Sequence, residues 1–419
     1  MNPIRQNARV LTASLVGTSI EFFDFYIFGT AAALVFGSLF FPAQSSSAQQ
    51  MAAFMSFGLA FIARPLGAIA FGHFGDRIGR KATLVSSLML MGGSTVLIGT
   101  LPGYATIGII APFLLCTLRF GQGFGLGGEW GGAALLAVEN APKGWEARFG
   151  AAPQMGAPIG FLFSNGLFLL LGLSLSQDDF IAWGWRIPFL ASAVLVAVGL
   201  WIRLRITETR QFAEAAAPPV AVPIAEVLGR HLPQLLAGSA GVIAVFAVFY
   251  LGTAFALSYS TTTLHLDRQT FLALQLGVNL FFVGGIVLGA FLADKIAPKL
   301  IIAAGAALIA LVGFFYAPAL LSRSYPEIFA MLAVSQLAMG LGYGPLSLWL
   351  SGLFPVRVRY TAISLAFTIG GIVGGALSPI AAQALAGAGH FDWVGGLLLA
   401  GGLLTLIGVS AARPASAAE

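Results

Sequence analysis

The chain has very little of two things that soluble proteins of its size contain, charge and cysteine. Only 9% of its 419 residues are charged, whereas about 25% are charged in an ordinary soluble domain. The one cysteine, Cys116, excludes an internal disulfide and a multi-cysteine metal site. The four histidines lie far apart and lack the spacing of metal ligands, so we expect no metal and no cofactor: His73, His231, His265 and His390.

Apolar residues and glycine take the place of the missing charge. The sequence is 58% hydrophobic, with 53 glycines and 35 phenylalanines, and its mean hydropathy is +0.91. A soluble protein with this composition would expose far too much apolar surface, so we predict an all-α membrane protein in a lipid bilayer. The net charge of +5 does not indicate nucleic-acid binding, because the basic residues are scattered in short clusters.

Twelve apolar runs are long enough to cross a bilayer, which takes about 20 residues in a helix. The first is taken as a retained helix, because it is too long for a signal peptide and carries two acids. The expected spans are 11–40, 51–73, 82–102, 106–138, 148–174, 184–204, 231–260, 270–293, 299–320, 326–352, 360–386 and 391–411.

Basic residues predict the orientation. Sixteen of the 21 lysines and arginines fall in the segments on the side of the N-terminus, and only Arg186, Arg268 and Arg323 fall on the other side. Arg64 and Arg119 lie inside spans. Because cytoplasmic loops of membrane proteins are enriched in lysine and arginine, we expect a multi-pass plasma (inner) membrane protein with both termini in the cytoplasm.

The chain divides into two related halves. The predicted organisation is a six-helix bundle over 1–205, a cytoplasmic linker over 206–230 with three prolines, a second six-helix bundle over 231–412 and a short tail over 413–419. GHFGDRIGRK, residues 72–81, aligns with AFLADKIAPK, residues 290–299, at a constant offset of 218. Two copies of a six-span unit in one orientation are typical of transporters.

Several motifs resemble those of a known protein family. GHFGDRIGRKATL resembles the loop between helices 2 and 3 of the major facilitator superfamily, and RFGQGFGLGGEWGGA, residues 119–133, resembles its helix-4 motif. IEFFDFYIFG, ARPLGAIAFGHFGDR, WGWRIPFL and FPVRVRYTAISL are similar to the metabolite:proton symporter branch of that superfamily. The resemblance implies the major facilitator fold, alternating access, and import of carboxylates, cyclic acids or zwitterionic solutes driven by protons.

The resemblance also implies a conformational latch at the cytoplasmic side, where Asp76 would bridge the two halves. A carboxylate at a helix C-terminus opposes the helix dipole, so it needs a cation or another helix N-terminus as a partner. The second copy of this motif, AFLADKIAPK at residues 290–299, is degraded, and we expect a weaker latch there. The predicted latch residues are Gly72, Asp76, Arg77, Gly79, Arg80, Lys81 and Asp294.

Ionisable residues inside the spans are confined to the first half and indicate function, because charge within a bilayer is costly. Glu21 and Asp24 lie three residues apart and share a helical face, and with Glu129 they are the proton-coupling candidates. Arg119, Gln122 and Glu129 fall within about 80° of each other on a helix. Arg119 is the candidate cation for a substrate carboxylate; a structural ion pair is the alternative.

The second half offers hydrogen-bonding side chains. We expect it to contribute shape and polar contacts to the substrate through Tyr250, Asn279, Gln336 and Tyr343, with Arg119 and Gln122 as the substrate-binding residues of the first half. The GxGxxG pattern over 123–128 is not a nucleotide site, because no strand precedes it; its glycines are expected to let helices approach closely.

The sequence therefore predicts a proton-coupled symporter that imports a small polar metabolite, either an organic acid or a zwitterionic solute. Its expected partners are the substrate, protons and lipid, and it is expected to act as a monomer. An exporter of the same fold is the alternative, since residues 156–160 are similar in part to a Gly/Pro element of antiporters. An enzyme is not expected, because no catalytic grouping or phosphate loop is present in the sequence.

Overall fold

The computed structural model describes residues 7–414 except 43–44, 79, 128 and 206–222. It describes no side chain at 8–10, 13, 72–84, 202–205 and 223. The described residues form helices and connecting segments without a strand. This agrees with the expectation that backbone in lipid pairs its polar groups within helices.

The helices of the first half are α2 (Ala8–Ala31), η1 (Ala32–Phe36), α3 (Gly37–Phe40), α4 (Ser46–Ile78), α5 (Arg80–Thr100), α6 (Tyr104–Ile107), α7 (Ile110–Leu126), α8 (Glu129–Glu139), α9 (Glu146–Gln154), α10 (Gly156–Ser174), α11 (Gln177–Ala182), η2 (Gly184–Arg186) and α12 (Ile187–Arg205).

The helices that follow are α14 (Pro223–Arg230), α15 (Leu232–Tyr250), η3 (Leu251–Phe255), α16 (Ala256–Thr262), α17 (Arg268–Ala293), α18 (Pro298–Leu321), α19 (Tyr325–Tyr343), α20 (Leu346–Ser351), α21 (Arg359–Gly371), η4 (Ile372–Leu377), α22 (Ser378–Gly387), η5 (Phe391–Trp393) and α23 (Val394–Ala411).

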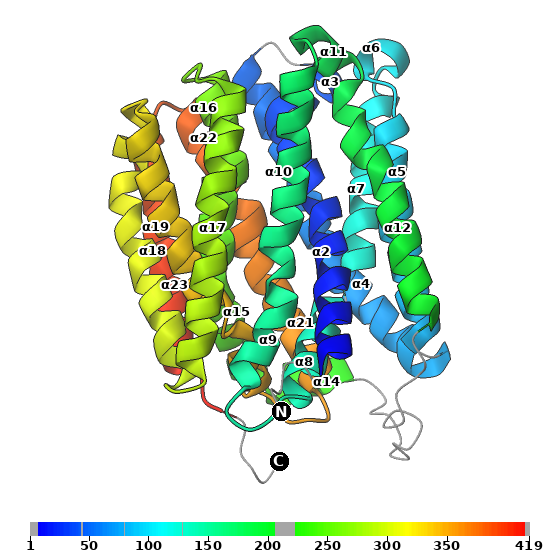
Figure 1. The fold of residues 1–419 in the computed structure, drawn as a ribbon, viewed down its shortest axis with the longest axis vertical. Helices are drawn as coiled ribbons and strands as arrows, with labels where there is room; N and C mark the ends of the chain where they lie inside the picture. The colour runs from blue at the N-terminus through cyan, green and yellow to red at the C-terminus, as the bar shows by residue number, and fades with distance from the viewer. Residues whose placement is uncertain (1–6, 43–44, 79, 128, 206–222, 415–419) are drawn as a thin grey trace.

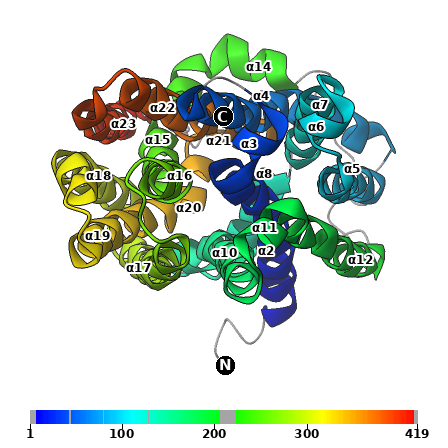
Figure 2. The same cartoon turned by 90° about the horizontal axis from the view of Figure 1, so that it is seen from above.

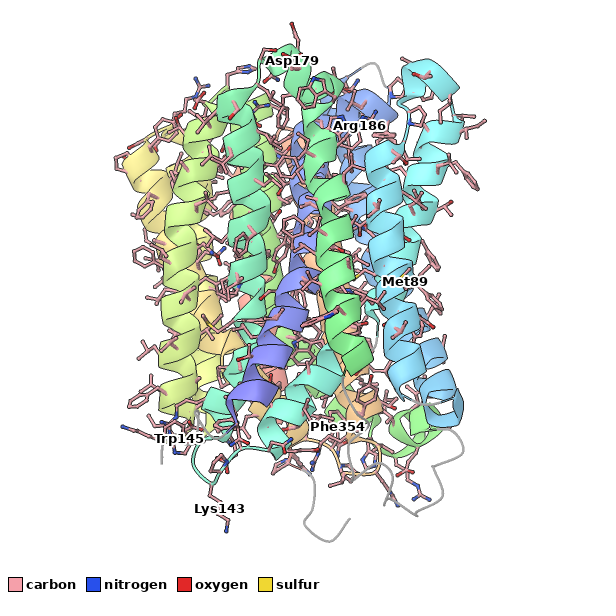
Figure 3. The ribbon with its side chains drawn as sticks, turned by 45° about the vertical axis from the view of Figure 1, so that its right-hand side comes forward. Met89, Lys143, Trp145, Asp179, Arg186 and Phe354 are labelled. Atoms are coloured by element: carbon pink, nitrogen blue, oxygen red, sulfur yellow. The ribbon has the colours of Figure 1, made fainter. Side chains whose placement is uncertain are left out.

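The long helices stand side by side in two groups, one from each half of the chain (Figures 1 and 2). Helix α10 packs along α17, and α4 packs against α21, η4 and α22, so these two contacts join the halves. The N- and C-termini lie at the same end of the molecule (Figure 1). Lys143 and Trp145 lie at this end, while Asp179 and Arg186 lie at the opposite end (Figure 3).

Ten helices of the described chain are long and apolar enough to cross a membrane, and they match ten of the twelve expected spans. The third expected span corresponds to α5, whose described apolar part is Val85–Thr100. The fourth corresponds to α7 and α8, which lie on either side of residue 128. The predicted all-helical membrane fold is therefore confirmed.

The two halves share an irregularity. The first span changes to π-helix at Ala32–Phe36, and its counterpart in the second half does so at Leu251–Phe255, 219 residues later. Amide side chains donate hydrogen bonds to backbone carbonyl oxygens of these segments. Gln50 donates to the carbonyl oxygen of Ala33, and Gln275 donates to those of Gly252 and Thr253. The repeat seen in the sequence thus extends to the backbone geometry of the first and seventh spans.

Glycines allow α4 and α7 to touch through their backbones. A Cβ atom added at Gly123 would lie 2.1 Å from the carbonyl oxygen of Ala60, and one added at Gly67 would lie 1.9 Å from that of Phe124. Both distances are far below van der Waals contact. The packing interpretation of the glycine pattern is therefore confirmed at Gly123, and Gly67 adds a close approach that the pattern did not include.

We expect Gly123→Ala to lower the thermal unfolding temperature of the purified protein, because the methyl group forces α7 away from α4. Overpacking of this kind costs about 1–3 kcal/mol. The matched control is Gly166→Ala in α10, where an added Cβ meets no atom within 4 Å. Equal unfolding temperatures for the two variants would contradict this account of the α4–α7 contact.

Candidate functional site

Aromatic side chains from both halves meet in the interior between the two bundles. Phe25 and Tyr26 of α2 and Phe61 of α4 come from the first half, and Phe249 and Tyr250 of α15 come from the second. The ring centroids of Phe61 and Tyr250 are 5.5 Å apart, and those of Tyr26 and Phe249 are 4.9 Å apart. Phe25 lies 5.2 Å from Phe61. We call these five residues the central aromatic cluster.

Two buried arginines lie against this cluster. The guanidinium carbons of Arg64 and Arg119 are 4.4 and 4.3 Å from the centroid of Phe25, and Arg119 is also 4.0 Å from that of Phe28. Arg119 is 0% exposed and Arg64 is 5% exposed. Ring faces attract cations. Among the described residues, however, Nη2 of Arg119 and Nε of Arg64 have no hydrogen-bond partner, so both retain donors for a ligand.

A chain of polar side chains leads from Arg119 toward Asp24. Arg119 donates from Nη1 to Oε1 of Gln122 at 2.9 Å, and Gln122 donates from Nε2 to the hydroxyl of Thr95 at 2.7 Å. The carboxyl group of Asp24 lies beside the hydroxyl groups of Thr95 and Ser192. It is 1% exposed, and within the described chain neither of its oxygens has a hydrogen-bond partner in good geometry. Asp24 is thus a buried acid without a cationic partner among those residues.

The other two acids of the first half occupy different surroundings. Glu21 lines, together with Arg64 and Trp130, a cavity of about 30 Å³ between α2, α4, α8 and α21. This volume suits water and is too small for a metabolite. Glu129 begins α8 and accepts a hydrogen bond from the hydroxyl of Ser87 in α5. Of the predicted polar stripe, Arg119 and Gln122 are bonded to each other, whereas Glu129 belongs to the next helix.

The four substrate-binding candidates of the second half are all buried, but they differ in the contacts that they make. Tyr250 belongs to the central aromatic cluster, and Gln336 has a buried Oε1 without a partner among the described residues. Asn279 donates to a backbone carbonyl of α10 at 2.9 Å. Tyr343 accepts, through its backbone carbonyl, a hydrogen bond from Gln154 at 3.0 Å. Asn279 and Tyr343 therefore join the two halves in this state.

Amide side chains that the sequence reasoning missed form a second polar link between the halves. Thr30 donates its hydroxyl hydrogen to Oδ1 of Asn165 at 2.7 Å, and Asn165 donates from Nδ2 to Oε1 of Gln275 at 3.2 Å. Asn165 is in α10 and Gln275 is in α17. The available signal was an amide side chain within a largely apolar span, because such a group needs a partner on a neighbouring helix.

Asp294 is the only predicted latch residue whose side chain the structure describes. It caps the C-terminus of α17, accepts from Nε of Arg148 at 2.5 Å and accepts from the backbone N–H of Ala147 at 2.8 Å. It therefore has a cation and a helix N-terminus as partners, as a carboxylate in this position requires. The side chains of Asp76, Arg77, Arg80 and Lys81 lie outside the described part of the chain, as do the surroundings of Gly72 and the whole of Gly79. The expected weakness of the second copy of the motif therefore stays a prediction.

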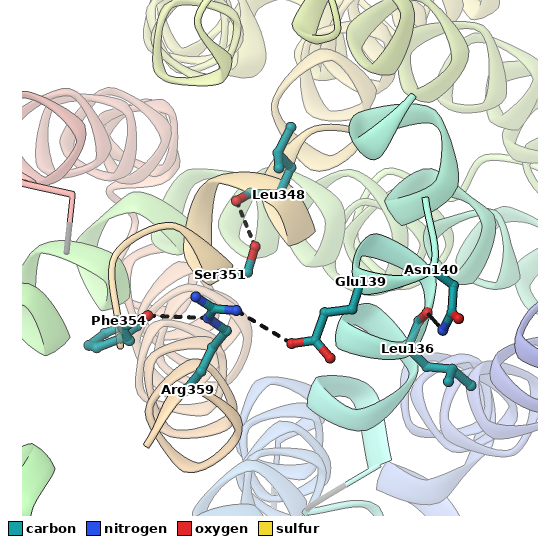
Figure 4. Close-up of polar contacts among 7 residues, drawn as sticks. All are labelled: Leu136, Glu139, Asn140, Leu348, Ser351, Phe354 and Arg359. Atoms are coloured by element: carbon teal, nitrogen blue, oxygen red, sulfur yellow. Dashed lines mark hydrogen bonds and ion pairs between the residues drawn. The ribbon is translucent and has the colours of Figure 1, made fainter. Parts of the chain in front are cut away.

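A second ion pair joins the halves near the same end. Nη1 of Arg359 in α21 lies 3.4 Å from Oε1 of Glu139 in α8, and Nε of Arg359 donates to the carbonyl of Phe354 at 3.2 Å (Figure 4). The Glu139 carboxylate is half exposed, so this pair contributes little on its own. It is a contact between the halves in addition to that of Asp294 with Arg148 and Ala147.

We expect Asp294→Asn to open the end of the molecule that carries the termini. The change removes the ion pair with Arg148 and weakens the contact with the start of α9. The probe is the alkylation rate of Ser347→Cys in a Cys116→Ser background, because Ser347 is 1% exposed and donates to Gly150 across the interface. The rate should rise severalfold.

Lys295→Gln is the control for this experiment, since it changes the neighbouring charge and Lys295 is exposed. A rate that is unchanged by Asp294→Asn, or raised equally by Lys295→Gln, would exclude Asp294 as a latch.

Comparison with known proteins agrees with this architecture. The model of the Major Facilitator Superfamily matches residues 14–379. The chain is 44% identical to the inner membrane metabolite transport protein YhjE of Escherichia coli, over 97% of this chain and 94% of that protein. It is 38% identical to the shikimate transporter of Escherichia coli, over 95% and 92%. It is 31% identical to the proline/betaine transporter of Salmonella typhimurium, over 89% and 77%.

The fold is also that of a solved transporter. The partially occluded inward-open xylose transporter XylE from Escherichia coli superimposes with a TM-score of 0.75 at 17% identity, over 95% of each chain. At this identity the likeness shows the fold alone. With the family model and the relatives above, the chain is a multi-pass inner-membrane metabolite transporter that belongs to the major facilitator superfamily and, within it, to the metabolite:proton symporter family.

Proposed function

We propose that this transporter imports a small polar metabolite together with protons, and that Asp24 carries the proton. The observation that supports this is the buried Asp24 carboxyl group, which has no cationic partner among the described residues and lies beside only the hydroxyl groups of Thr95 and Ser192. An unpaired carboxylate inside a membrane protein is costly, so the group takes up a proton in this state. Movement of Arg119 or water toward Asp24 would favour release of that proton. Glu21 and Glu129 are the secondary candidates.

The substrate in this proposal carries a carboxylate that binds Arg119. A guanidinium group grips a carboxylate through two parallel hydrogen bonds, and Nη2 of Arg119 is available for one of them. Gln122, Tyr250, Asn279, Gln336 and Tyr343 would surround the rest of the molecule. Shikimate, proline and betaine, named for two of the relatives, all carry a carboxylate. The proposed substrate class is therefore an organic acid or a zwitterionic solute.

Transport in this proposal proceeds by alternating access between two bundles, 1–205 and 231–412, joined by a cytoplasmic linker over 206–230 and followed by a tail over 413–419. The end that carries the termini and Lys143 faces the cytoplasm, because basic loops are retained there. The contacts of Asp294 and Arg359 would break when this end opens. The link from Thr30 through Asn165 to Gln275 would break when the opposite end opens. The protein acts as a monomer.

The test uses purified protein in proteoliposomes with an imposed pH gradient. A thermal-shift screen of organic acids, betaines and amino acids first selects a ligand, and labelled ligand is then offered to the vesicles. Symport predicts accumulation on the alkaline side, which collapses when a protonophore removes the gradient. Accumulation of the ligand on the acidic side would instead support the exporter. Uptake whose rate and extent do not depend on the pH gradient would refute proton coupling.

A further inference from the structure

A cavity of about 230 Å³ opens at the end of the molecule opposite the termini, within the first bundle. It lies between α3, the segment after α5, α11 and η2, well away from the central aromatic cluster. Arg186 is seen at this end in Figure 3. Its lining includes Leu39, Phe40, Asp178, Ile181, Trp185 and Arg186.

Trp185 lines this cavity and carries a buried hydrogen-bond donor that is unused in the described chain. The residue is 0% exposed, and its indole Nε1 has no hydrogen-bond partner among the described residues. Its ring is held by Phe36, Phe40 and Phe189, at centroid distances of 5.4, 6.0 and 5.8 Å. A buried N–H group without an acceptor costs free energy, so an acceptor from outside the protein would stabilise this arrangement.

Arg186 brings a cation that is already oriented. Its guanidinium carbon lies 4.4 Å from the centroid of the Trp185 ring, and Nη1 donates to the carbonyl oxygens of Gly99 and Leu101 at 3.1 and 2.5 Å. These two bonds use both hydrogens of Nη1. The hydrogens on Nε and Nη2 bond to no other residue in the described chain. Such a fixed fork matches the oxygens of a carboxylate or a phosphate.

Asp178 brings the opposite charge to the same cavity. Within the described residues its carboxylate makes neither a hydrogen bond nor an ion pair, whereas the neighbouring Asp179 carboxylate bonds to Ser176. The cavity therefore combines an acid, a guanidinium group and an indole N–H, each with unused capacity. This arrangement is complementary to a molecule that carries one positive and one negative group.

The cavity lies at the depth where spans meet the aqueous phase. One candidate span ends at Phe40 and another begins at Gly184, and both boundaries border the cavity. Trp183, which is 46% exposed, lies next to it, and exposed tryptophan is typical of the headgroup layer. The volume is below the roughly 300–1,000 Å³ of sites for drug-sized ligands, so it suits a headgroup or a small solute.

We propose that this cavity binds a zwitterion with a primary ammonium group, either as the phosphoethanolamine headgroup of a lipid or as a free solute. The anionic oxygens lie on Arg186 and on the Trp185 indole N–H, and the ammonium group lies on the carboxylate of Asp178. The site is separate from the central one and is independent of the proposed coupling to protons.

Native mass spectrometry of the transporter, purified and exposed to defined vesicles, tests this proposal. The vesicles contain equal amounts of dioleoyl phosphatidylethanolamine and dioleoyl phosphatidylglycerol, because the second lipid lacks the ammonium group. We expect the protein to retain the ethanolamine lipid at least fivefold over the glycerol lipid, or to bind free O-phosphoethanolamine by calorimetry. Asp178→Asn and Trp185→Phe should each reduce this binding at least fivefold.

Glu327→Gln is the matched control, since Glu327 is an exposed acid at the same end of the other half. Retained lipid that free O-phosphoethanolamine does not displace identifies a lipid site, and binding of the free compound alone identifies a solute site; both support the proposal. Asp178 is exposed, so its substitution leaves the fold intact even where Trp185→Phe does not. Equal retention of the two lipids without binding of O-phosphoethanolamine, or full binding by Asp178→Asn, would overturn it.

Discussion

Asp24→Asn is expected to abolish accumulation of substrate driven by a pH gradient, with a decrease of at least a hundredfold, while binding and exchange of substrate continue. Asparagine has nearly the shape of aspartic acid but cannot take up or release a proton. The side chain is 1% exposed in the interior of the bundle, beside Thr95 and Ser192. The substitution also removes the cost of a buried acid, so the variant should be at least as stable as the parent.

The measurement compares two modes of transport by the same proteoliposomes. Uptake against a gradient requires a coupled proton, whereas counterflow between labelled and unlabelled substrate does not. Asp392→Asn, at an exposed acid near the end of the second half, is the control and should transport normally. Gradient-driven accumulation by Asp24→Asn with the usual pH dependence would transfer the role of proton carrier to Glu21 or Glu129.

Arg119→Lys is expected to lose most substrate binding, nearly as much as Arg119→Ala. Lysine keeps the charge, but it lacks the planar fork that bonds to Gln122 while offering Nη2 to a carboxylate. It also packs less well on the rings of Phe25 and Phe28. Hydrogen bonds to charged groups contribute about 1.5–3 kcal/mol each, so losing one or two corresponds to a decrease in affinity of at least tenfold.

Substrate affinity by calorimetry and initial uptake rates check this prediction, with the amount of protein in the membrane measured in parallel. Arg323→Lys, at an exposed position in a loop, is the control for a general effect of replacing arginine. Full transport by Arg119→Lys would argue against two-point recognition of a carboxylate. Loss of protein from the membrane would instead favour a structural role for Arg119 through its contacts with Gln122, Phe25 and Phe28, since the structure pairs it with no acid in the described chain.

Composition and spacing determined the class of this protein. With so little charge and twelve apolar runs of about 20 residues, the sequence predicted helices across a bilayer, because a helix pairs its backbone polar groups within itself. The glycine at 123 predicted a close helix contact because it removes a side chain from one helical face, and a helical face is a property of local sequence. Helical spacing likewise predicted that Arg119 and Gln122 lie side by side, because residues three apart on a helix are neighbours.

The partners of the buried charges were decided by the tertiary structure. Asp24 lies beside Thr95 and Ser192, which belong to the third and sixth spans, and no periodicity within the first span indicates them. Arg148 and Asp294 are 146 residues apart and meet only because α9 packs on the end of α17. Asn165 and Gln275 likewise come from different halves. Local sequence sets which residues share a helical face, whereas the packing of helices distant in the chain decides what that face meets.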